Sequence, residues 1–144
     1  MPKDIKKTNN MELLNNEEVL ENYDDLELGP QSKSDNLFTA KARKHQSLWR
    51  VKNGLEIGVG PDKNSNKKGV PTKYGNMIAN GEANGSNFYF PETFEYAKWR
   101  VNTRIKGETI DSYRLFNNLL SSMPMAFNLF HPLMMLKMEN PSLV

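Results

Sequence analysis

The segment that most constrains the fold is residues 123–136, which begins at Met123, ends at Leu136 and holds ten apolar side chains in 14 positions. It is shorter than the roughly 18 residues that a membrane-spanning helix needs. Two prolines, an asparagine and a histidine also interrupt it. A segment this apolar has to pack against a second layer of protein. We expect its partner to be the other helices of the chain, a second copy of the chain, or a sheet outside it.

The N-terminus and the composition exclude several classes of protein. The first ten residues are charged and no apolar segment follows them, so they are not a secretory signal, and we expect a cytoplasmic protein without a membrane span. The chain has no cysteine, which excludes disulfide scaffolds, cysteine-based metal sites and thiol nucleophiles. Its two histidines, His45 and His131, are interpreted as surface or packing residues.

The net charge of +2 conceals an uneven distribution of charge along the chain. Residues 1–35 carry four lysines and nine acidic residues, whereas residues 36–106 carry thirteen basic and five acidic residues. A basic segment suits a polyanion, because every phosphate that a cation neutralises releases counterions. An ordinary solvated basic surface is the alternative.

Two helices are predicted before residue 52, and the strand signal is weak throughout the chain. The first is a short amphipathic helix over residues 11–21, and the second runs from 36 to about 50, with Ser34 or Asp35 as its cap. The apolar stripe of the second helix consists of Leu37, Phe38, Ala42, Leu48 and Trp49. The glycine-rich residues 52–73 predict a loop.

Three further helices are predicted in the C-terminal half. Pro91 suits the first position of a helix and Gly107 suits its end. The apolar stripe of that helix consists of Phe94, Ala97, Val101 and Ile105. The next helix opens at Asp111 or at the threonine two residues before it. A last helix, capped by Ser122, runs to Pro132, and the six residues after it either continue the helix or begin a strand.

Residues that could carry catalysis are not apparent. Metal-dependent phosphodiester cleavage needs two or three carboxylates around a divalent cation, usually with a lysine nearby. No aspartate in the chain is followed at strand distance by Glu-x-Lys, because Glu56 precedes Ile-Gly and Glu139 precedes Asn-Pro. We therefore predict no catalytic residue, no metal ligand and no cofactor within this chain.

Basic side chains on two of the predicted helices form the candidate binding surface. Lysine and arginine bind phosphates, and glutamine can bond to base edges. The candidate nucleic-acid-binding residues are Arg43, Lys44, Gln46, Arg50, Lys98, Arg100 and Arg104. In the alternative interpretation, Trp49 and Trp99 anchor the core and the basic residues only keep the surface soluble.

Several sequence motifs occur together and in a fixed order. Residues 43–50 read RKHQSLWR, with the pattern R..QS.wR. This motif is followed by YGNM at 74–77, NF at 87–88, PETF at 91–94 and RV at 100–101. The longest motif, RLFNNLLSSMPMAFNLFHPL, covers residues 114–133. Over residues 38–137 the chain resembles the start of a family of bacterial proteins classed as restriction endonucleases, within the PD-(D/E)XK nuclease-like superfamily.

The resemblance implies an α/β nuclease whose sheet carries the catalytic Asp and Glu-x-Lys downstream of the last motif and uses Mg²⁺. No position of this chain matches those catalytic residues, and His131 stands where the family has a small residue. We therefore expect a mainly α chain, the helical N-terminal part of an α/β PD-(D/E)XK-like fold whose sheet core is missing or incomplete. The expected division is an acidic, partly disordered segment at 1–33, a helical nuclease-like region at 34–138 and a tail at 139–144.

Three hypotheses follow for function. The favoured one is an N-terminal fragment or subunit of a PD-(D/E)XK restriction-endonuclease-like protein, without nuclease activity by itself, in which Mg²⁺ serves only the complete protein. The missing nuclease portion, or a second copy in a homo-oligomer, would dock on residues 123–136. The alternatives are a freestanding module that binds DNA and a non-catalytic protein-interaction domain.

Overall fold

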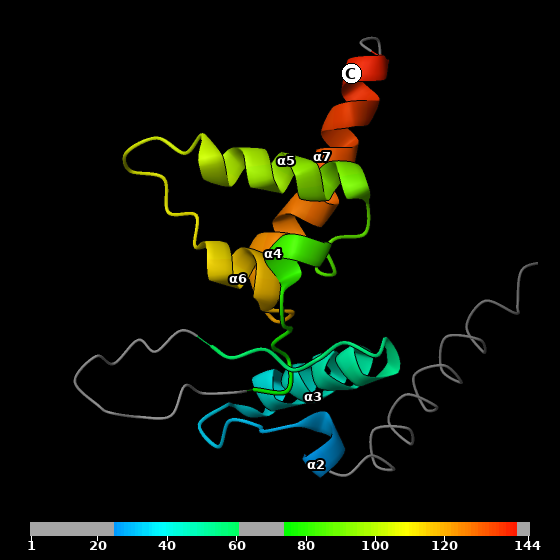
Figure 1. Ribbon diagram of the computed structural model, residues 1–144, viewed down its shortest axis with the longest axis vertical. Helices are drawn as coiled ribbons and strands as arrows, with labels where there is room; N and C mark the ends of the chain where they lie inside the picture. The colour runs from blue at the N-terminus through cyan, green and yellow to red at the C-terminus, as the bar shows by residue number, and fades with distance from the viewer. Residues whose placement is uncertain (1–24, 61–73, 141–144) are drawn as a thin grey trace, which may run out of the picture.

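The computed structural model describes residues 25–60 and 74–140, which form helices and connecting loops (Figure 1). In chain order the helices are α2 (Asp25–Leu28), α3 (Leu37–Lys52), α4 (Gly81–Asn84), α5 (Pro91–Asn102), α6 (Ser112–Asn117) and α7 (Ser122–Glu139). Within these ranges no strand forms, so the prediction of a mainly helical chain is confirmed. The helix expected at 11–21 and most of the loop expected at 52–73 lie outside the described residues. None of the described helices is long and apolar enough to cross a membrane.

The start of α3 differs from the prediction. Asn36 is the cap, and its side chain accepts a hydrogen bond at 2.8 Å from the amide three residues later. This bond satisfies one of the free N–H groups of the first turn. Asp35 does not cap the helix, because both of its carboxylate oxygens accept hydrogen bonds from the Arg43 guanidinium instead.

The predicted apolar stripe of α3 is only partly buried. Leu48 is buried, but Leu37 is 78% exposed, Phe38 is 82% exposed and Trp49 is 36% exposed. Trp99 on α5 is also exposed. The interpretation of the two tryptophans as core anchors is therefore wrong.

The end of α5 comes earlier than predicted. The helix begins at Pro91, as expected, but it ends at Asn102 and not at Gly107. The Thr103 hydroxyl donates a hydrogen bond to the carbonyl of Trp99 at 2.8 Å, which gives the chain a local alternative to another helical turn. Ile105 consequently lies outside the helix on an exposed loop, and its assignment to the apolar stripe is wrong.

Of the two alternatives for the residues after Pro132, the structure shows continuation of the last helix. Ser121, rather than Ser122, caps α7 by accepting a hydrogen bond from the amide of Met123, and the helix then continues through Pro132 to Glu139. Proline removes one backbone hydrogen bond. The leucines and methionines that follow it favour the helical conformation, and the helix continues through them.

The helices form two layers, which Figure 1 shows one above the other. In the upper layer, α5, α6 and α7 surround a core in which Ala97, Leu115 and Phe116 are buried. The rings of Phe88, Phe94 and Phe116 add an aromatic cluster with centroids 5.6 to 6.0 Å apart. Tilted and edge-on ring pairs of this kind contribute about 0.5–1.5 kcal/mol beyond the area they bury.

The lower layer consists of α2 and α3, and residues 74–79 join it to the upper layer. Gly75 donates its amide hydrogen to the carbonyl of Pro30 at 2.9 Å in the lower layer. Ile78 donates to the carbonyl of Asn117 at 2.9 Å, at the end of α6 in the upper layer. Glycine is required at 75, because a Cβ there would meet the carbonyl oxygen of Leu28.

Candidate functional site

Arg50, the last residue of the RKHQSLWR motif, lies in the interior of the lower layer and is only 7% exposed. Its guanidinium donates hydrogen bonds to the carbonyl of Gly75 at 2.7 Å and to that of Leu55 at 2.8 Å. A longer bond of 3.3 Å reaches the carbonyl of Leu28. One cation thus holds α2, the end of α3 and the linking segment 74–79 together.

Burial affects the charge state of this arginine. Loss of hydration disfavours the charged form and lowers the pKa of Arg50 below its ordinary value. Arginine is the most basic side chain of proteins and keeps its charge despite this effect. Its three guanidinium nitrogens each donate to backbone carbonyl groups, and this placement favours a structural role over phosphate binding.

Arg43, the first residue of the same motif, is held on three sides. Its Nε donates to a carboxylate oxygen of Asp35 at 2.6 Å, and its Nη1 donates to the amide oxygen of Asn76 at 2.5 Å. Its guanidinium carbon also lies 4.6 Å from the ring centroid of Tyr74. The hydrogen bond from Arg43 keeps the pKa of Asp35 below its usual range.

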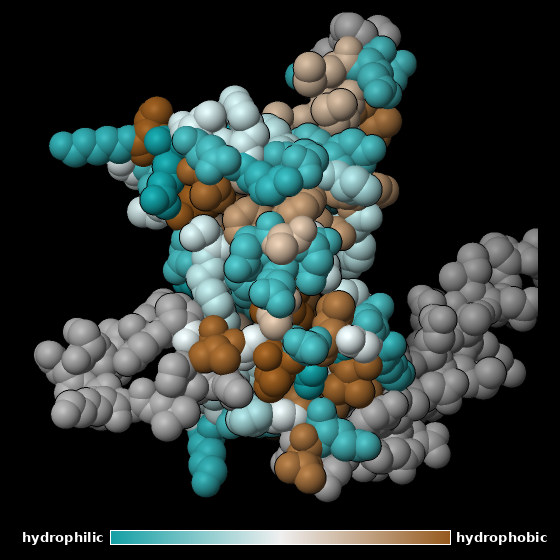
Figure 2. Space-filling model, viewed as in Figure 1, coloured by the Kyte–Doolittle hydropathy of each residue, from teal (hydrophilic) through white to brown (hydrophobic). Residues whose placement is uncertain are grey.

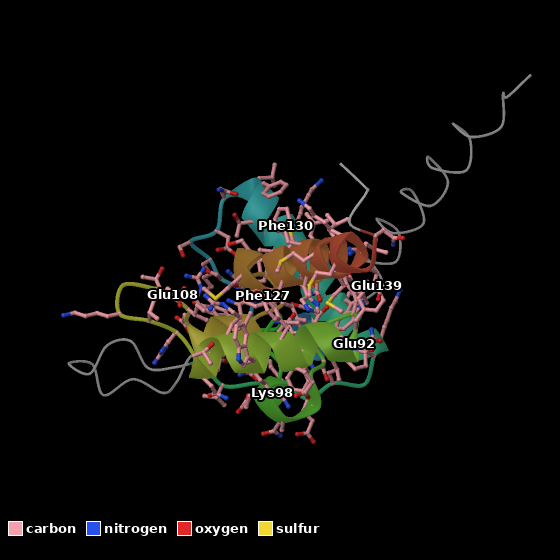
Figure 3. The ribbon with its side chains drawn as sticks, turned by 90° about the horizontal axis from the view of Figure 1, so that it is seen from above. Glu92, Lys98, Glu108, Phe127, Phe130 and Glu139 are labelled. Atoms are coloured by element: carbon pink, nitrogen blue, oxygen red, sulfur yellow. The ribbon has the colours of Figure 1, made fainter. Side chains whose placement is uncertain are left out.

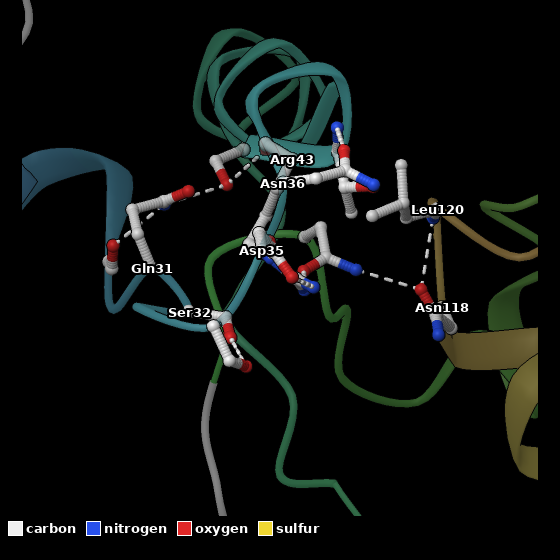
Figure 4. Close-up of polar contacts among 12 residues, drawn as sticks. Gln31, Ser32, Asp35, Asn36, Arg43, Asn118 and Leu120 are labelled. Atoms are coloured by element: carbon white, nitrogen blue, oxygen red, sulfur yellow. Dashed lines mark hydrogen bonds and ion pairs between the residues drawn. The ribbon is translucent and has the colours of Figure 1, made fainter. Parts of the chain in front are cut away.

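A chain of side-chain amides extends this cluster into the upper layer (Figure 4). The amide nitrogen of Asn76 donates to the side-chain oxygen of Asn118 at 2.8 Å. The same Asn118 oxygen accepts the backbone amide of Leu120 at 3.0 Å. Asn76 therefore connects Arg43 on α3 with the turn between α6 and α7. Both asparagines belong to sequence motifs, YGNM at 74–77 and the long motif at 114–133, but no local pattern predicts this contact between them.

The other predicted nucleic-acid-binding residues lie farther apart. Lys44 and Gln46 are half-buried on α3, in the lower layer. Lys98 pairs with Glu95 at 2.6 Å on α5, in the upper layer. The α3 candidates and the α5 candidates therefore lie in different layers of the structure.

The two remaining candidates are at the end of α5. Arg100 donates to Glu108 at 2.5 Å, and this hydrogen bond lowers the pKa of the Glu108 carboxyl below its usual range. Arg104 is exposed in the following loop and donates to the carbonyl of Ile110 at 3.1 Å. The role of the seven residues in nucleic-acid binding stays a prediction, and Arg104, the one that is exposed, fits it better than Arg43 or Arg50.

The histidine in the long motif is a packing residue. His131 is 7% exposed, its ring stacks on Tyr96 with centroids 4.5 Å apart, and its Nδ1 is 3.0 Å from the hydroxyl of buried Thr93. This contact joins α5 to α7. In the part of the chain that the structure describes, no three histidine, aspartate or glutamate side chains gather where they could hold a metal ion.

The projecting C-terminal half of α7 exposes apolar side chains on several sides of the helix, because residues 133–136 are consecutive and a helix has 3.6 residues per turn. In Figure 1 the C-terminal end of α7 projects beyond α5, and Figure 2 shows moderately hydrophobic atoms along it. We call this surface the α7 face. Its exposed residues are Met125, Leu129, Phe130, Leu133, Met134, Met135, Leu136 and Met138, each 39 to 74% exposed. In Figure 3, Phe127 lies between α7 and α5, whereas Phe130 lies on the side of α7 away from α5.

Comparison with known proteins gives one match. The model of a family described as the PD-(D/E)XK nuclease superfamily matches residues 33–141. No curated protein and no solved structure matches the chain. The superfamily that the sequence motifs implied is confirmed, and the narrower assignment to restriction endonucleases stays a prediction.

Proposed function

Because the chain belongs to the PD-(D/E)XK nuclease superfamily, we propose that it is the helical N-terminal part, or a separate helical subunit, of a restriction-endonuclease-like protein. By itself it has no nuclease activity. The catalytic sheet and the Mg²⁺ belong to another portion of the nuclease, which docks on the α7 face. The exposure of the α7 face is the observation that carries this proposal.

The size of the α7 face indicates that a partner covers it. If each of its large side chains has on the order of 200 Å² of surface, the eight exposed fractions leave roughly 900 Å² of apolar surface in contact with water. The largest apolar patch on a typical monomer is about 300–600 Å². One partner in a standard-size interface buries about 800 Å². Because these residues lie on several sides of the helix, a partner that encloses the C-terminal half of α7 would cover about as much surface as one side of a standard interface.

A catalytic sheet is the partner that the geometry favours. Helices and sheets bury their apolar faces against each other in layers, and in α/β folds a helix layer covers the sheet. The described residues of this chain supply helices without a sheet. Four of the eight exposed residues of the α7 face are methionines, whose flexible side chains adapt to an irregular surface.

The absence of activity in the isolated chain can be tested directly. The purified protein is incubated with duplex DNA and Mg²⁺ or Mn²⁺, and we expect no cleavage, because the reaction needs carboxylates that converge on the cation. Cleavage that survives repurification and scales with the protein concentration would overturn the proposal.

The docking can be tested with a PD-(D/E)XK polypeptide of the same genome that carries the Asp…Glu-x-Lys spacing. We expect a stoichiometric complex in sedimentation velocity that the Leu129→Glu, Leu133→Glu double variant abolishes. The control variant, Lys106→Glu, changes an exposed residue in the loop after α5 and should leave the complex intact. A dimer of the chain alone that the double variant dissociates would assign the α7 face to a second copy and contradict the proposed partner.

A further inference from the structure

The outward side of α3 combines aromatic rings with positive charge. Phe38 is 82% exposed and Trp49 is 36% exposed, although both are large aromatic residues. Lys41, His45 and Lys52 are exposed on the same helix. We call these five residues the α3 stripe.

Helical geometry places the α3 stripe on one line. Its residues follow one another at intervals of three, four, four and three, and neighbours at such intervals lie on the same side of a helix. With a rise of about 1.5 Å per residue, Phe38 and Trp49 are roughly 16 Å apart along the axis. The ring of His45 lies between them, and the two lysines lie beside this row of rings.

The charge of α3 favours an anionic partner for the stripe. The 16 residues of the helix include no aspartate or glutamate. Asp35, the acidic residue closest to its start, is bound to Arg43 on another side of the helix. Since Arg43 and Arg50 point into the protein, the cations of the outward side are lysines.

We propose that the α3 stripe binds single-stranded nucleic acid, with bases stacked on Phe38 and Trp49 and phosphates neutralised by Lys41 and Lys52. Unpaired bases offer their faces to aromatic side chains, whereas a duplex hides them in its own stack. With about 3.4 Å between stacked nucleotides, the stripe spans about five nucleotides. This binding is independent of the α7 face and of the partner proposed for it.

Fluorescence tests the proposal in the full chain. A Trp99→Phe background leaves Trp49 as the single tryptophan, because the chain contains two. We expect oligo(dT) or oligo(U) to quench its emission, and duplex DNA of equal length to bind at least tenfold more weakly. Binding of either single strand supports the proposal, and the better of the two identifies the natural sugar.

Substitutions test which side chains of the α3 stripe contact the nucleic acid. Stacking on one aromatic residue is worth about 1–3 kcal/mol per base, so Phe38→Ala should weaken binding about five- to 150-fold. Tyr89→Ala is the matched control, because Tyr89 is 79% exposed and lies outside α3, next to the start of α5. Replacing Lys41 and Lys52 with glutamine should reduce the slope of log affinity against log salt by about 1.4, since each single-strand phosphate contributes about 0.7.

Three results would overturn the proposal. The first is the absence of quenching by either single strand at low salt. The second is an equal loss of affinity in Tyr89→Ala and Phe38→Ala. The third is quenching by anionic lipid vesicles without quenching by nucleic acid, which would assign the stripe to a membrane surface. Circular dichroism of each variant establishes that it is folded, which the exposure of these side chains leads us to expect.

Discussion

Replacement of Arg50 by methionine should destabilise the protein strongly, although methionine retains the unbranched apolar stem of the side chain. The two short hydrogen bonds of its guanidinium, at 2.7 and 2.8 Å, connect a charged donor to the carbonyls of Gly75 and Leu55. A hydrogen bond to a charged group contributes about 1.5–3 kcal/mol. Relief from burying a charge offsets part of the loss. We therefore expect the free energy of unfolding to fall by about 4 kcal/mol, a large share of the 5–15 kcal/mol typical of a domain.

Urea denaturation followed by far-UV circular dichroism measures this change. In a chain of this size, 1 kcal/mol corresponds to a shift in Tm of about 2–4 °C, so Arg50→Met should lower Tm by about 10 °C. Lys52→Met is the matched control, because it removes an exposed cation from the same helix; we expect a change within about 0.5 kcal/mol. Arg50→Lys should fall between the two, since an ammonium group cannot span all the carbonyls that the guanidinium reaches.

The result that refutes this reasoning is a normal unfolding free energy in Arg50→Met. If this variant is as stable as the wild type but binds DNA less well, Arg50 belongs to a nucleic-acid surface, as the sequence analysis predicted. Loss of stability together with normal DNA binding at a temperature where the variant is folded would support the structural role.

Three further predictions concern the same scaffold. Gly75→Ala should lower Tm by at least 5 °C in a thermal melt, because its new Cβ meets the last carbonyl of α2; an unchanged Tm would contradict the close packing. Arg43 makes the pKa of Asp35 lower in the folded state than in the unfolded state. This pair therefore stabilises the protein above pH about 4, and the stabilisation is lost as the pH falls through the folded pKa. In Asp35→Asn, the urea midpoint should therefore decline less between pH 6 and 2 than it does in the wild type. An identical decline in the two proteins would show that the Asp35–Arg43 pair does not contribute to the pH dependence of stability. Thr93→Val should cost about 1–2 kcal/mol in urea denaturation, because the Nδ1 atom of buried His131 loses its partner; a cost near zero would show that water or another group replaces the hydroxyl.

Local signals explain what the sequence predicted correctly. Pro91 begins α5 and Asp111 caps α6 because these preferences depend on a few neighbouring residues. The errors at Asp35 and at the end of α5 have a common origin. In each case a side chain formed a different bond, to Arg43 or to a carbonyl one turn back, which the helix signals do not encode.

The direction of a side chain was harder to predict than the helix that carries it. Arg43 and Arg50 lie on a basic helix, and their charge alone suggested contact with phosphates. Their buried partners, Asn76 and Gly75, are 33 and 25 residues away along the chain. No local pattern reveals such a pairing. Conversely, Leu37 and Phe38 were predicted to be buried because they are hydrophobic, but no element of the described chain covers them.

The two halves of the motif FNLF at 127–130 differ in their surroundings. The first half packs within this fold, whereas the second half is exposed. Phe127 packs against Tyr96, and Asn128 bonds to the backbone of both Asn87 and Tyr89, so the first half of the motif is satisfied within the chain. Leu129 and Phe130, the second half, are 57% and 58% exposed. Packing within the described chain therefore accounts for only half of a motif that the chain shares with a nuclease family. A partner on the α7 face would bury the other half, which supports the proposal that the catalytic portion of a nuclease docks there.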